Sequence, residues 1–357
     1  MLSFVDLIQK AQADSAADVF IVAGQPLSYK RGRDIIAVDE ERVMPNTARA
    51  LVAEAYEMAG RDMKPFLENG DDDFALSIPG LCRLRISTYM QRGSCAAVVR
   101  IIAFGIPDYT RLGIPENVIR VGDTRKGLVL VTGPAGNGKS TTLACIIDRI
   151  NKTRSGHIIT LEEPIEFLYR NDKCIISQRE VEIDSKDFIT ALRACLRQAP
   201  DVILLGEMRD YETISTAMTA AETGHLVIST LHTVGAVNTI DRIIDIFPPN
   251  QQQQVRVQLA SILRTVISQQ LVRTKDGGVV PAFEIMHVNN AIRNMIRESK
   301  VHQIDSTIGV SAAEGMVSMD ASLLELYKNG VIEAETALSA SLSPDLMAKR
   351  MGIALPK

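Results

Sequence analysis

Tryptophan is missing from this sequence of 357 residues, and aromatic residues as a class make up only 4% of it. An excess of positive charge is missing too, because 39 basic residues face 43 acidic ones and leave a formal net charge of −4. Proteins that bind single-stranded nucleic acid stack bases on aromatic side chains in a basic groove, and this composition supplies neither feature. We therefore expect no nucleic-acid partner.

Paired cysteines and long apolar runs are also missing. The odd number of cysteines and the lack of any C-x-x-C pair argue against a zinc cluster and a disulfide framework. The five are Cys82, Cys95, Cys145, Cys174 and Cys195. No stretch reaches the roughly 18 apolar residues that span a bilayer, and the N-terminus lacks the basic and apolar regions of a secretory signal. These features predict a cytoplasmic protein that reaches a membrane only through another protein.

The first 104 residues mix helical and strand patterns, which is typical of a small α+β domain. Helices are predicted over Phe4–Ala17 and Pro45–Met58, and a short strand begins at Asp18. Residues 81–102 alternate large apolar with arginine or small polar side chains. This alternation predicts two paired strands that turn at residues 91–93.

A linker is predicted at residues 105–120, because two glycines and two prolines fall within its first part. From Val121 to Lys357, short runs of continuous apolar residues alternate with longer helical stretches. This alternation predicts an α/β domain whose mostly parallel sheet is covered by helices on both faces. The expected strands are Leu128–Val131, His157–Leu161, Val202–Leu205 and Leu226–Thr230. The tail after Val317 has helical spacing.

A glycine-rich run fits the P-loop pattern G-x-x-x-x-G-K-[ST] in full, after a predicted strand and at the start of a predicted helix. Glycines let backbone N–H groups surround phosphates, and the helix N-terminus adds partial positive charge. We expect Lys139 to reach the β- and γ-phosphates of ATP and the Ser140 hydroxyl to hold Mg²⁺. The predicted nucleotide-binding residues of this run are Gly133, Pro134, Ala135, Gly136, Asn137, Gly138, Lys139, Ser140 and Thr141.

Carboxylates follow two of the predicted strands. Glu207 ends the apolar run that starts at Asp201, where we expect it to bind Mg²⁺ through water or to polarise the attacking water. Glu162 and Glu163 end the preceding strand, and either acid is a candidate to orient that water. The sequence leaves open whether Glu207 or Glu162 is the general base.

Two histidines bracket the last predicted strand of this series. His225 precedes Leu226–Thr230 and His232 follows it. Either is a candidate to sense the γ-phosphate, and we assign His225 to nucleotide binding and His232 to catalysis. The alternative is that each histidine is merely hydrogen-bonded and has no role in the reaction, which is common for a single histidine.

Five segments together resemble the type II/IV secretion ATPase superfamily. They are residues 132–142, 162–166, 206–210, 219–225 and 229–232, and they match its Walker A, Asp box, Walker B and His box. The chain most resembles the type IV pilus retraction ATPases within that superfamily. Ala291–Glu298 is similar to their AIRNLIRE motif, with Met295 in place of leucine, a volume-conserving change. Relatives often have aspartate where this chain has Glu163 and Ala199.

The resemblance implies a PAS-like domain at residues 1–104 and a RecA-like ATPase domain at residues 121–357. It also implies a homohexameric motor that uses ATP and Mg²⁺ to power pilus retraction and twitching motility. In such rings, arginines of the N-terminal domain contact the nucleotide. The matching positions here are Arg85 and Arg100, with Arg92 a weaker candidate. A guanidinium suits this role because its planar fork pairs bidentately with phosphate oxygens.

The resemblance further implies an inner-membrane pilus platform protein as partner, which would hold the ring at the inner face of the cell membrane. An extension ATPase or an accessory retraction ATPase is a further candidate partner. Extension and type II secretion ATPases remain alternative functions, but they usually carry additional N-terminal sequence and a four-cysteine zinc cluster. This chain begins almost at its PAS-like domain and lacks that cysteine pattern. More remote alternatives are a nucleic-acid translocase and a scaffold that hydrolyses nothing.

Overall fold

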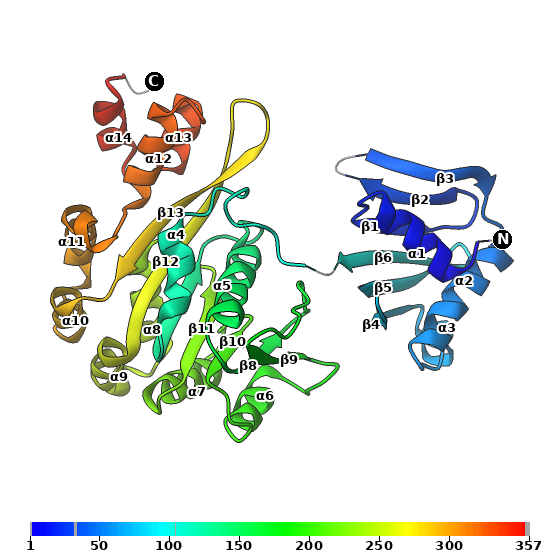
Figure 1. The fold of residues 1–357 in the computed structure, drawn as a ribbon, viewed down its shortest axis with the longest axis horizontal. Coiled ribbons are helices and arrows are strands. Elements are labelled where there is room, and N and C mark those ends of the chain that lie inside the picture. The colour runs from blue at the N-terminus through cyan, green and yellow to red at the C-terminus, as the bar shows by residue number, and fades with distance from the viewer. Residues whose placement is uncertain (1, 32–33, 104, 354–357) are drawn as a thin grey trace. The chain divides into compact units, whose positions relative to one another are not determined.

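Two units, each with its own hydrophobic core, make up the chain. The computed structural model describes residues 2–31, 34–103 and 105–353 (Figure 1). The N-terminal unit comprises Met1–Gly105 with Glu166–Tyr169, and the C-terminal unit comprises Ile106–Ile165 with Arg170–Lys357. The domain boundary predicted at residue 104 lies outside the described residues.

The N-terminal unit is a six-stranded antiparallel sheet in the order β3-β2-β1-β6-β5-β4. Its strands are β1 (Asp18–Ile21), β2 (Pro26–Arg31), β3 (Asp34–Arg42), β4 (Asp71–Ile78), β5 (Cys82–Gln91) and β6 (Ser94–Ala103), and its helices are α1 (Phe4–Ala13), α2 (Pro45–Met58) and α3 (Lys64–Asn69). Leu84 and Ile86 of β5 are buried, whereas Arg85 between them is exposed. One face of the sheet therefore faces the core and the other faces solvent, as is common for antiparallel sheets.

The predicted hairpin is confirmed, and its turn explains the register. Arg92 and Gly93 connect β5 to β6 with φ values of 49° and 75°. Two successive residues with positive φ form the turn type whose twist matches paired strands. The helix predicted to reach Ala17 instead ends at Ala13, because Ser15 adopts a left-handed φ of 56° that no helix can continue.

The C-terminal unit is a seven-stranded sheet in the order β13-β12-β7-β11-β10-β8-β9. All neighbouring strands are parallel except β12 and β13, so the expected mostly parallel α/β fold is confirmed. Its strands are β7 (Gly127–Thr132), β8 (Gly156–Glu162), β9 (Cys174–Glu180), β10 (Val202–Leu205), β11 (Leu226–Leu231), β12 (Leu263–Arg273) and β13 (Val279–His287). Every residue of β7, β10 and β11 is buried, which requires cover on both faces of the sheet.

Helices connect these strands and continue beyond the sheet (Figure 1). They are α4 (Glu116–Ile119), α5 (Lys139–Thr153), α6 (Phe188–Cys195), α7 (Tyr211–Glu222), α8 (Ala236–Asp245), α9 (Pro249–Ile262), α10 (Asn290–Arg297), α11 (Ile304–Val310), α12 (Met319–Lys328), α13 (Ala334–Ala340) and α14 (Pro344–Met351). The segment expected as a linker includes α4, whose Val118 and Ile119 are buried. In the described ranges, no helix combines the length and the apolar character that a bilayer crossing needs. The predicted helical tail is confirmed by α12 to α14.

A buried carboxylate joins β13 to the start of α8. Glu284 is only 2% exposed, and one of its oxygens accepts a hydrogen bond of 2.7 Å from the backbone N–H of Ala236. The other oxygen lies 3.5 Å from the N–H of Met319 at the start of α12. Burial raises the pKa of the Glu284 carboxyl because it disfavours the charged form. Glu284 therefore holds two helix N-termini against the hairpin.

We predict that Glu284→Ala lowers the free energy of unfolding by about 1–3 kcal/mol, because it leaves the buried Ala236 N–H without an acceptor. Glu284→Gln keeps an acceptor and should cost less. The folded state binds the proton of the Glu284 carboxyl more tightly than the unfolded state does. The wild type should therefore lose stability relative to Glu284→Gln as pH rises above about 4.3, the pKa of an ordinary glutamate. Urea denaturation at several pH values measures both effects. Equal stability of the alanine variant and the wild type would contradict this role.

Candidate active site

Residues 133–138 form a loop that leads directly from β7 into α5. Gly133, Gly136 and Gly138 have φ values of 139°, 76° and 77°, in the region that glycine adopts without strain. Gly138 precedes α5, and no side chain caps that helix. The first N–H groups of α5 therefore lack intrahelical partners and face the loop with partial positive charge, which makes the turn an anion-binding site.

Lys139 places an ammonium group at this loop. It is 8% exposed, and its Nζ donates hydrogen bonds of 2.8 Å to the carbonyl of Gly133 and 2.9 Å to that of Pro134. Ser140 and Thr141 follow on the first turn of α5 and are half-buried. The structure thus gathers the predicted ammonium and hydroxyl groups at one helix N-terminus.

The loop is fastened to β12 through Gln269, a residue that the sequence reasoning missed. Gln269 is 2% exposed; its amide donates to the carbonyl of Asn137 at 2.8 Å and accepts from the Thr142 hydroxyl at 2.7 Å. The Asn137 side chain in turn accepts from the N–H of Leu271 at 2.7 Å. A Cβ on Gly133 would lie 2.2 Å from the Gln269 carbonyl oxygen, so only glycine fits there. We call Gln269, Asn137 and Thr142 the loop clamp.

Three further predicted residues lie at the same edge of the sheet as the loop. Glu162 is the last residue of β8, Glu207 follows β10 and His232 follows β11. These strands run parallel to β7 in the order β7-β11-β10-β8, so their carboxyl ends share one edge. In doubly wound sheets, ligands bind at this edge.

Glu207 and Glu162 have different surroundings. The Glu207 carboxylate forms an ion pair of 2.6 Å with Arg209 and lies 3.4 Å from Nε2 of His232. Glu162 accepts hydrogen bonds from the Thr160 hydroxyl at 2.6 Å and from the Gln178 amide at 3.3 Å. Glu207 is therefore held by exposed partners, whereas Glu162 accepts hydrogen bonds from side chains of β8 and β9.

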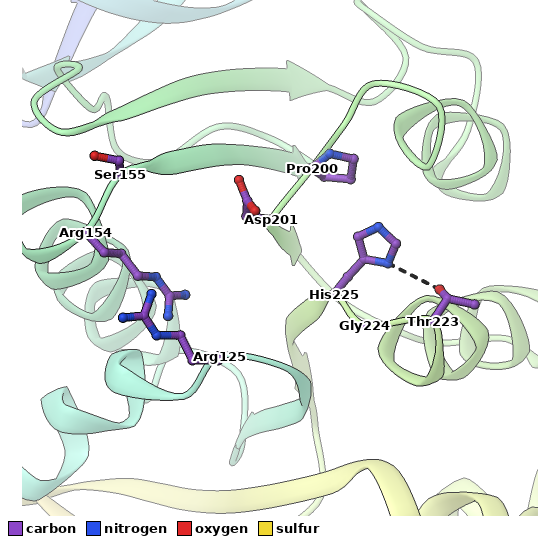
Figure 2. Close-up of a pocket in the computed structure, with 8 residues that line it drawn as sticks. All are labelled: Arg125, Arg154, Ser155, Pro200, Asp201, Thr223, Gly224 and His225. Atoms are coloured by element: carbon purple, nitrogen blue, oxygen red, sulfur yellow. Dashed lines mark hydrogen bonds between the residues drawn. The ribbon is translucent and has the colours of Figure 1, made fainter.

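The structure places His225 away from the phosphate loop, contrary to the expectation that His225 binds the nucleotide. His225 precedes β11, and its carbonyl accepts a hydrogen bond of 3.0 Å from the N–H of Gly127, the first residue of β7. It therefore lies at the amino edge of the sheet, whereas the phosphate loop lies at the carboxyl edge. The six residues of β11 separate the two edges by about 20 Å. Figure 2 shows His225 in a pocket at that amino edge.

Arg85 and Arg100 of the N-terminal unit are directly opposite each other on β5 and β6. Both are exposed, and opposite residues of an antiparallel pair project from the same face. Arg100 also pairs with Asp18 at 2.9 Å. Like charges directly opposite are unfavourable on a sheet, so this arrangement favours an anion as a further partner. Arg92 lies on the hairpin turn.

Comparison with known proteins places these features in context. The family model of type II/IV secretion system proteins matches residues 4–333. The type IV pilus retraction ATPase PilT of Pseudomonas aeruginosa is 41% identical over 344 residues, which are 96% of this chain and 99% of that protein. A twitching motility protein of Neisseria gonorrhoeae is 44% identical over 292 residues, 82% of this chain and 78% of that protein.

Among solved structures, the pilus retraction motor PilT with bound ADP superposes with a TM-score of 0.88 at 44% identity. The alignment covers 98% of this chain and 100% of that one. The similarity therefore extends over both units of the chain, the phosphate loop included.

We predict that Gln269→Ala weakens nucleotide binding about tenfold, because the loop clamp loses a buried donor and a buried acceptor. Titration with a fluorescent ADP analogue measures the effect. The matched control is Gln270→Ala, since the neighbouring Gln270 bonds to the carbonyl of Ala340 and not to the loop. Wild-type affinity in Gln269→Ala, with the fold intact, would show that the clamp does not position the loop.

Proposed function

Because the chain belongs to the family of type II/IV secretion system proteins, we propose that it is an ATPase motor that powers the retraction of type IV pili. The observation that carries this proposal is the anion-binding turn before α5, with buried Lys139 inside it and Glu207 at the same edge of the sheet. A positive turn suits a triphosphate, and a carboxylate across from it suits activation of water.

The residues at the turn fit MgATP. The N–H groups that begin α5 and the ammonium of Lys139 would hold the phosphates, and the Ser140 hydroxyl would hold Mg²⁺ with Glu207 acting through water. When bound, Mg²⁺ neutralises charge on the β- and γ-phosphate oxygens. The loop clamp would keep these donors in place, so that they need not reorganise during the reaction.

We assign the polarisation of water to Glu207 and a positioning role to Glu162. The side chains that hold Glu207 are those of Arg209, which is 72% exposed, and His232, which is 49% exposed. An incoming phosphate can therefore displace them. Glu162 is tied to Thr160 and Gln178 within the sheet, which supports a role in ordering this edge. His232, next to Glu207, is suited to sense the γ-phosphate.

Retraction is favoured over extension by the AIRNLIRE-like segment Ala291–Glu298, which forms α10 and its C-cap Glu298. Ile292 and Ile296 are fully buried in the core of the C-terminal unit, whereas Asn294 and Arg297 share a hydrogen bond on the outer side. The Nε of Arg293 donates to the carbonyl of Ala260 at the end of α9. A helix anchored in this way can present a polar face to a partner while it moves with the core.

The motor would act as a homohexameric ring in the cytoplasm, bound to the inner face of the cell membrane through a pilus platform protein. The adjacent guanidiniums of Arg85 and Arg100 support this ring, because they offer two phosphate-binding groups on one exposed sheet face. In the ring, Arg85 would act on the nucleotide held by a neighbouring subunit.

We predict that Glu207→Gln binds MgATP close to wild-type affinity but hydrolyses it at least about 100-fold more slowly, because the amide cannot polarise water. Steady-state phosphate release and equilibrium ATP binding separate the two effects. The matched variant is Glu162→Gln. Near-normal hydrolysis by Glu207→Gln together with a loss in Glu162→Gln would assign the base to Glu162.

A mixing experiment tests the ring. Arg85→Ala subunits keep their phosphate loop, and Lys139→Ala subunits keep their arginine, so mixed rings should regain part of the ATPase activity that each variant lacks alone. Phosphate release from mixed and unmixed rings is the measurement, and light scattering verifies the assembly. Mixed rings that stay as inactive as the single variants would contradict action across an interface.

A further inference from the structure

A polar cavity of about 220 Å³ lies at the amino edge of the C-terminal sheet, opposite the edge that holds the phosphate loop. Arg125, Arg154 and His225 line it, together with Asp201 and the hydroxyl residues Ser155 and Thr223 (Figure 2). Drug-sized ligands occupy about 300–1,000 Å³, so this cavity suits a smaller group. All of these residues belong to the C-terminal unit.

Two guanidinium groups share this cavity. Figure 2 shows Arg125 and Arg154 with their guanidiniums next to each other. One nitrogen of Arg154 donates to the carbonyl of Thr124 at 2.8 Å. Burial and the charge of Arg125 both lower the pKa of Arg154. In the described part of the chain, Arg125 forms no ion pair or side-chain hydrogen bond. Close like charges are unfavourable, and an anion between them removes the cost.

The one carboxylate of the cavity, Asp201, offsets the charge of this pair only in part, because the net pKa of Arg154 is still lowered. Asp201 accepts a hydrogen bond of 2.8 Å from the backbone N–H of His157, and its own N–H donates to the carbonyl of the same residue at 2.9 Å. Within the described ranges, Asp201 forms no salt bridge with either arginine. The guanidiniums of Arg125 and Arg154 therefore share the cavity with a single carboxylate, that of Asp201, which is hydrogen-bonded to the backbone of β8.

His225 adds a ring nitrogen. Its Nδ1 lies 2.9 Å from the carbonyl of Ala220, and because a carbonyl only accepts, Nδ1 carries the proton. Nε2 is then an acceptor, which can receive a hydrogen bond from the P–OH group of a hydrogen phosphate. The Thr223 hydroxyl, 3.3 Å from Nδ1, lies at the same rim.

We propose that this cavity is a second anion site, which binds a phosphate group. Two planar guanidiniums match phosphate oxygens in a bidentate manner, and the Ser155 hydroxyl can add a donor. The Thr223 hydroxyl already donates to the carbonyls of Thr219 and Ala220. The proposal goes beyond the ATPase function, since no residue of the cavity belongs to the phosphate loop.

The elements that form the cavity also end at the active site. The helix α5 begins at Lys139 and is followed by Arg154, while β10 leads from Asp201 to Glu207. The strand β11 leads from His225 to His232 in the same way, and β7 leads from the Arg125 side to the phosphate loop. At about 1.5 Å per residue, the 15 residues of α5 set the two anion sites about 22 Å apart. The same helix and strands thus connect the two edges of the sheet.

Calorimetric titration of the full-length protein with inorganic phosphate tests the proposal. The background is Lys139→Ala, which removes the principal phosphate ligand of the active site. We expect one phosphate per chain in this background, and a loss of affinity of about tenfold or more when Arg125→Ala is added, because charge-assisted hydrogen bonds are lost. Arg125 is exposed, so this change should leave the fold intact. Arg154→Lys, which keeps the charge but loses the fork, should weaken binding less.

The matched control is Arg120→Ala, a surface arginine that pairs with Asp123 at 3.6 Å and does not line the cavity. Ribose 5-phosphate in a second titration separates free phosphate from a phosphate monoester as the natural ligand, and binding of either supports the site. The proposal is overturned if Arg125→Ala binds phosphate as tightly as its background, or if the Lys139→Ala protein binds none. ATP hydrolysis by the wild type is measured separately, so failure of the ATPase function is distinguishable from failure of this site.

Discussion

The phosphate loop depends on the close approach of two backbones, those of Gly133 and Gln269. The carbonyl oxygen of Gln269 occupies the space that a side chain at Gly133 would need. The Gln269 amide then fills the remaining gap by bonding to Asn137 and Thr142. Because Gln269 and Thr142 are buried, loss of either would leave a polar atom without a partner. The shape of the anion-binding turn is therefore set as much by β12 as by the loop itself.

Local signals in the sequence were sufficient for the strands that carry the site. Each of β7, β10 and β11 is a continuous apolar run bounded by polar residues or glycine, and the structure places these strands within about two residues of their predicted bounds. Other strands had no such signal. In β9, apolar and polar residues do not alternate regularly enough to predict a strand. The strand β12 follows α9 directly, with no turn residue to mark where the helix ends.

The P-loop pattern predicts a glycine turn between a strand and a helix, and the structure has that turn between β7 and α5. Such a turn can be predicted because glycine spacing and the following lysine are local properties. What the sequence could not supply was contact across a long separation. Gln269 lies 132 residues from Asn137, and nothing near either residue marks the pair. His225 was misplaced for the related reason that a residue next to a strand can lie at either edge of the sheet, and only the strand direction decides which.

The β12–β13 hairpin bears both Gln269 of the loop clamp and the buried carboxylate of Glu284, which is paired with Ser268 of β12. The side chains of Ser268 and Glu284 also hold the start of α8, through the N–H groups of Gly235 and Ala236. The hairpin thus connects the phosphate loop to α8 and to the start of α12. A shift of the loop must either move these helices with it or expose buried amides. Mechanical output from this unit is accordingly expected to take the form of a rigid displacement of those helices, rather than a loosening of the loop alone.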